Sequence, residues 1–290
     1  MKGAAPTEMR HAVFPAKRQR SGLAFTLTEL LAVTAIVALL LTLLIPAINR
    51  SRNQALAIRC LRNMQQLQLA WMMYADDNEG RLPAVKPGAF AGPDRWISGW
   101  LDMSRSPDNT NTLYLVSPEF AQIGPYVASP VLFRCPADPS FVKIGGREYP
   151  RVRSVSMNCW MNYRGEQPLQ DARRPHYRIY RKITDFLMPP PSGLWVLIDE
   201  RFDSINDGMF TVNLIGRAGR NAAVDSPAAY HNGGAGVAFA DGHAIVKRWK
   251  NRETFQPVSG GGPALLNGLG GDNPDVYWLQ NHATGKLIVY

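Results

Sequence analysis

A run of apolar residues near the N-terminus is the strongest pattern in this chain. Residues 30–47 read LLAVTAIVALLLTLLIPA, eighteen positions without a charge, and the run extends back to Phe25 if Glu29 is included. At ~1.5 Å per helical residue, the stretch from Phe25 to Ile48 reaches about 36 Å, which is enough to cross a hydrocarbon core of ~30 Å. The pattern therefore predicts a membrane-spanning helix over 25–48.

Beyond Pro46 the apolar positions form a stripe with helical spacing. The stripe steps by four, four, three, four and three residues, and the opposite face is polar. The helix should therefore continue over 49–78 as an amphipathic half, with a kink expected at Pro46, and Asp76–Gly80 should end it. The stripe is Leu56, Cys60, Met64, Leu67, Trp71 and Tyr74, and the polar face is Arg50, Arg59, Arg62, Gln65 and Gln68.

The remaining residues, 79–290, have strand patterns separated by turns. Residues 151–158 alternate with period two, 194–199 read as a buried strand, and Asp241-Gly242 between two apolar runs favours a hairpin with a two-residue type I′ turn. Strands that follow one another without helical patterns predict an antiparallel sheet, so the fold class is α+β. Residues 81–124 are turn-rich with Trp96 and Trp100 as the expected buried anchors, and 164–178 and 257–272 are predicted loops.

Composition narrows the functional classes. The chain has 290 residues, 46% apolar and 19% charged, which excludes a disordered, collagen-like or coiled-coil protein. Lys and Arg outnumber Asp and Glu by 32 to 23, but five of these bases and one acid lie in the first 24 residues. Since no basic stripe interleaved with aromatic residues follows, no nucleic-acid partner is expected.

Basic residues also bear on topology and on the rival hypothesis of a secretory signal peptide. Lys17, Arg18 and Arg20 precede the apolar run and Arg50 and Arg52 follow it, which favours a cytoplasmic N-terminus. A signal peptide would have a shorter apolar region that ends at a small-x-small site. Residues 55–57, Ala-Leu-Ala, offer such a site, but the run is too long and two arginines intervene.

Glu29 is a carboxylate inside the apolar run. An ionisable group there costs several kcal/mol unless it is paired or lies near the headgroups, so it is a candidate functional residue. The alternative is an interfacial Glu29 that precedes a helix starting at Leu30.

The stretch SGLAFTLTELLAVTAIVALLLTLLIPAI resembles the N-terminal segment of type IV prepilins and type II secretion pseudopilins. In that family a basic leader, here residues 1–24, ends in a small residue before Phe-Thr-Leu-x-Glu and the apolar helix. Glu29 is the fifth residue from Phe25 and Pro46 the twenty-second, as in the family. Ala24 replaces the usual Gly, and a cut after Gly22 would leave Glu29 seventh. The resemblance therefore implies cleavage between Ala24 and Phe25 by a prepilin peptidase, with N-methylation of Phe25.

The resemblance extends beyond the apolar run. Three segments look like those of pilin-like proteins with an H-x9-DG region. They begin at Cys60, at Arg134-Cys135-Pro136 and at His231, which nine residues separate from Asp241-Gly242. Residues 74–80 and 273–279 are similar too. This implies a pilin-like fold and a non-enzymatic subunit of a type IV pilus or type II secretion pseudopilus. Its partners would be other subunits and an inner-membrane assembly platform, and its C-terminal domain would be periplasmic or extracellular.

Three groups of residues could carry chemistry. His231, Asp241 and His243 could be acid–base partners, but the turn explains Asp241, and His231 is expected to hydrogen-bond backbone or Asp241. The acidic group of Asp199, Asp203 and Asp207 could hold calcium, as some pseudopilins do, but its spacing matches no EF-hand, so no metal or cofactor is expected.

The third group is the three cysteines. In an oxidising compartment one pair should form a disulfide. Cys60 lies on the packing face of the helix, and Cys135 belongs to a motif shared with the resembled family, so this pair is preferred over Cys135 with Cys159.

Two other functional classes stay open. One is a membrane-anchored binding module for a surface ligand such as a glycan, recognised through exposed tryptophans. The other is a hydrolase that uses His231.

Overall fold

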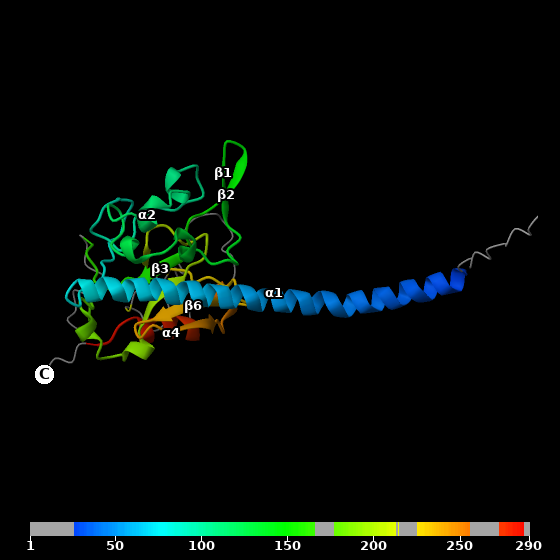
Figure 1. The fold of residues 1–290 in the computed structure, drawn as a ribbon. Helices are drawn as coiled ribbons and strands as arrows, with labels where there is room; N and C mark the ends of the chain where they lie inside the picture. The colour runs from blue at the N-terminus through cyan, green and yellow to red at the C-terminus, as the bar shows by residue number, and fades with distance from the viewer. Residues whose placement is uncertain (1–25, 166–176, 213, 215–224, 256–272, 287–290) are drawn as a thin grey trace, which may run out of the picture. The chain divides into compact units, whose positions relative to one another are not determined.

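The computed structural model describes residues 26–165, 177–212, 214, 225–255 and 273–286. The chain divides into two compact units, residues 1–49 and residues 50–290. One long helix, α1 (Leu27–Asp77), supplies the described part of the first unit and opens the second (Figure 1). The rest combines short helices with two sheets, so the predicted α+β class is confirmed.

Helix α1 continues through Pro46 without a break, where the sequence suggested a kink. It ends at Asp77, one residue before the end of the predicted range 49–78, because the chain turns out of the helix through Glu79 at φ 57° and Gly80 at φ 75°. The Gly80 N–H then donates to the carbonyl of Ala75 at 2.8 Å, which satisfies a carbonyl at the helix end.

The main sheet has five strands in the order β5-β3-β4-β6-β7. Three of its four pairings are antiparallel, and β6 and β7 form the predicted hairpin. The edge strand β5 runs parallel to β3, contrary to the prediction, because residues 200–208 carry the chain back to the far side of β3. The bounds are β3 (Val155–Asn158), β4 (Trp195–Asp199), β5 (Met209–Phe210), β6 (Gly234–Phe239) and β7 (Ala244–Arg248).

Strand β3 is shorter than the alternation over 151–158 predicted. Arg151 and Arg153 precede it and are 1% exposed. Their guanidinium groups donate to backbone carbonyls, Arg151 to Phe202 and Ile205 and Arg153 to Gly99 and Asn206. Buried arginines held by loop carbonyls produce the same period-two pattern as a strand.

The remaining elements are short. A separate hairpin of β1 (Phe141–Ile144) and β2 (Arg147–Pro150) stands apart from the main sheet (Figure 1). Trp96 is buried as expected, whereas Trp100 is only half-buried. The helices are α2 (Leu113–Val116), α3 (Arg252–Phe255) and α4 (Pro274–Ala283), with 3-10 turns η1 (Pro107–Asn109), η2 (Gly124–Tyr126), η3 (Pro130–Phe133), η4 (Ile183–Asp185) and η5 (Pro191–Gly193).

Helices cover both faces of the main sheet. The second half of α1 lies on one face, where the Trp71 Nε1–H points at the Met157 sulfur at 3.2 Å. Helix α4 lies on the other face, and its Trp278 packs edge-on against Phe239. The apolar stripe of α1 is buried as predicted from Cys60 to Trp71. Gln68, which the sequence assigned to the polar face, is buried as well, because it adjoins the stripe.

Candidate functional site

The first half of α1 is an exposed apolar surface. Every described residue from 26 to 55 is exposed. The helix is long and apolar enough, by length and composition, to cross a membrane. Its exposed large apolar side chains are Leu27, Leu30, Leu31, Val33, Ile36, Val37, Leu39, Leu40, Leu41, Leu43, Leu44, Ile45 and Ile48.

Glu29 closes a capping box at the start of this surface. The Glu29 N–H donates to Thr26 Oγ1 at 3.2 Å, and the Glu29 carboxylate accepts from the Thr26 N–H at 2.9 Å and the Thr26 hydroxyl at 2.7 Å. The helix begins at Leu27, so the alternative of a start at Leu30 is wrong. Thr-x-x-Glu before an apolar run is the sequence signal for this cap, and it was missed. Ala24 and Phe25 lie outside the described residues.

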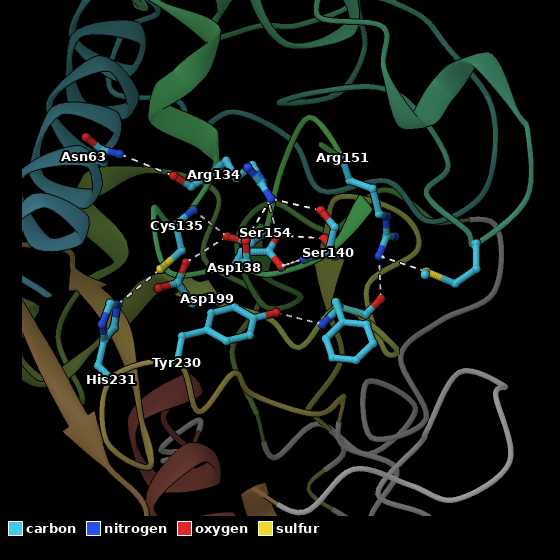
Figure 2. A network of polar contacts seen from close by, with 12 residues as sticks. Asn63, Arg134, Cys135, Asp138, Ser140, Arg151, Ser154, Asp199, Tyr230 and His231 are labelled. Carbon is cyan, nitrogen blue, oxygen red and sulfur yellow. Dashed lines mark hydrogen bonds and ion pairs between the residues drawn. The ribbon is translucent and has the colours of Figure 1, made fainter. Parts of the chain in front are cut away.

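Four side chains that the sequence singled out for different reasons meet in the second unit. Cys60 comes from α1, Cys135 from the loop after η3, Asp199 from the end of β4 and His231 from the loop before β6. Their sulfur, oxygen and nitrogen atoms all lie within 4.8 Å of one another, and all four residues are buried. Cys60 Sγ is 2.9 Å from Asp199 Oδ2, and Cys135 Sγ is 3.2 Å from His231 Nε2. Figure 2 shows the His231 ring directed at the Cys135 sulfur.

Neighbouring groups hold this Cys/Asp/His cluster in place. The Ser154 hydroxyl donates to Asp199 Oδ1 at 3.2 Å and accepts from the Cys135 N–H at 2.8 Å, so it orients two members at once (Figure 2). Gly236 leaves room, because a Cβ there would lie 2.8 Å from both Asp199 Oδ2 and Cys60 Sγ.

The electrostatics of the cluster follow from its burial. Burial raises the pKa of Asp199 to about 6, although hydrogen bonds from Cys60, Gly236 and Ser154 oppose the shift. A hydrogen bond to Cys135, then burial and the charge of Asp199, raise the pKa of the Cys60 thiol. Burial lowers the pKa of His231, whose Nδ1 has no hydrogen-bond partner among the described residues. In the absence of a bound cation, the surroundings therefore disfavour the charged form of these three groups.

Two expectations about these residues are wrong. Cys60 and Cys135 are not joined by a disulfide, although both sulfurs belong to the cluster. His231 contacts Cys135 and not Asp241, because Asp241 Oδ1 lies 2.5 Å from His243 Nδ1 across the hairpin turn.

The turn between β6 and β7 also differs in type from the prediction. The Gly242 N–H donates to the Phe239 carbonyl at 3.0 Å, and Gly242 has a φ of 95°. A type I′ turn would need positive φ at both central residues, whereas Asp241 is not in that region. Gly242 is therefore the one residue of the turn that needs the left-handed conformation.

The three aspartates considered for calcium do not meet. Asp199 joins the Cys/Asp/His cluster, Asp203 forms an ion pair with Arg201, and Asp207 accepts from the N–H groups of Gly88 and Met209. These separate partners do not assemble the six to eight oxygens that calcium needs.

Comparison with protein-family models, curated proteins and solved structures finds no match to this chain.

Proposed function

We propose that this protein is a pilin-like or pseudopilin subunit of a type IV pilus-like or type II secretion filament. The observation that carries the proposal is the exposed apolar half of α1 with Glu29 at its start. A prepilin peptidase would remove residues 1–24 and leave a methylated Phe25 as the first residue. The helix would hold the subunit in the inner membrane, with the N-terminus cytoplasmic and residues 79–290 outside, until the assembly platform adds it to the filament.

The assembly step rests on charge pairing in an apolar surrounding. Cleavage creates a cationic α-amino group at Phe25, and a buried charge without a partner is strongly unfavourable. Glu29 of one subunit would pair with this amine on its neighbour and so fix the axial register. Contact among the exposed leucines and isoleucines of neighbouring helices would supply the cohesion.

The capping box allows the charge of Glu29 to be separated from its structural role. Glu29→Gln keeps a side chain that can still accept from the Thr26 N–H but removes the negative charge. Thr26→Val removes the hydroxyl that caps the helix but keeps the carboxylate. We expect Glu29→Gln to lower the amount of sheared or cross-linked filament at least tenfold at unchanged subunit abundance, whereas Thr26→Val should still assemble. The opposite ranking would show that Glu29 acts as a helix cap and would overturn the register mechanism.

Processing provides a second test. N-terminal sequencing of the mature protein should return Phe25. A mature N-terminus at Ile58, after Ala55-Leu56-Ala57, would instead mean ordinary secretion and would remove the apolar helix from the product.

The two alternative functions receive less support. A glycan-binding module would need exposed tryptophans, and none of the seven tryptophans is exposed, since five are buried and Trp100 and Trp278 are half-buried. A hydrolase that uses His231 would need substrate access to a residue that is 4% exposed.

A further inference from the structure

We propose that Cys60, Cys135, Asp199 and His231 form a binding site for one zinc ion. The ligand atoms would be the two Sγ atoms, one carboxylate oxygen of Asp199 and Nε2 of His231. This inference does not depend on the proposed filament function.

The side-chain types fit zinc better than other common metals. Thiolate, imidazole and carboxylate are its usual ligands in proteins, and a structural zinc site is closed by four of them. Calcium and magnesium prefer sets made of oxygen atoms, so the two sulfurs argue against them. All four ligands come from the protein and are buried, which is the arrangement of a structural rather than a catalytic site.

The distances also fit a tetrahedral site. With Zn–S near ~2.3 Å and Zn–N or Zn–O near ~2.0–2.2 Å, neighbouring ligand atoms in a tetrahedron lie about 3.3–3.8 Å apart. The Cys60–Asp199 and Cys135–His231 contacts of 2.9 and 3.2 Å are slightly shorter than this, and the upper bound of 4.8 Å lies above it. Small side-chain rotations would therefore bring all four atoms into position.

The burial of several acidic groups in the cluster also supports a bound cation. Two thiols and a carboxyl group are buried together, and a divalent cation is what would allow all three to be negatively charged there. The neighbouring cation does not serve this purpose, because the Arg134 Nη2 donates to the carbonyls of Asp138 and Ser140 (Figure 2).

The surroundings are organised as a supporting shell. Ser154 fixes the Asp199 carboxylate and the Cys135 backbone, and outer hydrogen bonds of this kind orient metal ligands. Gly236 keeps open the space beside Cys60 and Asp199. A zinc ion here would join α1 to β4 and to two loops, so its binding free energy would stabilise the docking of the second half of α1 on the sheet.

The test uses the full-length protein in detergent, purified without chelators. Elemental analysis should find one zinc ion per chain. After removal of the metal under reducing conditions, Co²⁺ should restore one ion per chain with the intense visible absorption of a tetrahedral site and a thiolate-to-cobalt band in the near ultraviolet, and Zn²⁺ should displace it. This measurement on the wild type does not depend on whether any variant folds.

Variants then assign the ligands. Cys135→Ser and His231→Ala should weaken zinc binding at least tenfold, and His231→Cys, which keeps a ligand, should bind zinc again. Cys159→Ser is the matched control, because Cys159 is a buried cysteine outside the cluster and its loss should leave one ion per chain. Less than a tenth of an ion per chain without thiolate-to-cobalt absorption, or a Cys60–Cys135 disulfide in the native protein, would overturn the proposal. Equal loss of zinc in Cys159→Ser would overturn it too.

Discussion

The two halves of α1 differ in apolar content and have opposite surroundings. Residues 27–49 are exposed throughout, and their leucines, isoleucines and valines point to all sides of the helix. Between Cys60 and Ala75 the buried residues form one stripe against the sheet, whereas Leu69 and Met73 are exposed. The first half is therefore apolar all round, and the second half is amphipathic.

This difference indicates what each half is built to contact. An amphipathic helix needs one apolar partner, and the sheet of the same chain provides it through residues such as Met157 and Gly236. A helix that is apolar all round needs an apolar environment on every side, which a bilayer or a bundle of similar helices provides. The described residues of this chain leave that requirement unmet in the first half.

The largest expected effect comes from removing a large buried side chain from the second half of α1, which docks on the sheet and is called the docked half below. Trp71 is 0% exposed and stacks on Phe186 at a centroid distance of 6.3 Å. Trp71→Ala should lower the free energy of unfolding of the second unit by about 3–5 kcal/mol, because it leaves a large cavity. Leu39→Ala is the control in the first half, where Leu39 is 63% exposed, and it should leave this value unchanged. Chemical denaturation in detergent measures both, and equal losses would mean that the two halves unfold as one unit.

A smaller effect is expected where α1 meets the Cys/Asp/His cluster. In Gly236→Ala the new methyl group would lie 2.8 Å from Cys60 Sγ and from Asp199 Oδ2. Overpacking of this kind should lower the stability of the metal-free protein by about 1–3 kcal/mol. Gly92→Ala is the control, because the nearest atom to its Cβ, Asp94 Oδ1, is at an ordinary 3.6 Å. If both variants melt at the wild-type temperature, the backbone at Gly236 is free to move away from α1.

The sequence predicted those parts of the fold that depend on local periodicity. The buried stripe from Cys60 to Trp71 and the hairpin of β6 and β7 follow from spacing and turn chemistry alone. Helix α4 was missed although Asn273 caps it and Pro274 occupies its first position, so the local signal was present. The parallel pairing of β5 with β3 could not be predicted from the sequence, because it depends on the side of β3 to which a loop returns the chain.

The Cys/Asp/His cluster could be predicted only in its parts. Cys60, Cys135 and His231 were each singled out, but as a disulfide pair and a loop histidine, and Asp199 was considered for calcium. Their meeting depends on how α1 docks and on which face of β4 Asp199 occupies, and both are set by tertiary packing. Glu29 is different, because its contact with Thr26 is local and could have been predicted.

The smallest predicted effect has the opposite sign and concerns Gln68 in the docked half. Its side chain is 0% exposed, and neither Nε2 nor Oε1 has a hydrogen-bond partner among the described residues. A buried amide without partners loses its hydration without compensation, which costs about 1–3 kcal/mol. Gln68→Leu has a similar volume and removes this penalty, so the free energy of unfolding should rise by about 1 kcal/mol. Gln65→Leu, on the exposed face of the same helix, should change it little. A loss of stability in Gln68→Leu would show that the amide is hydrogen-bonded in solution, and that the docked half of α1 is held by a polar contact as well as by its apolar stripe.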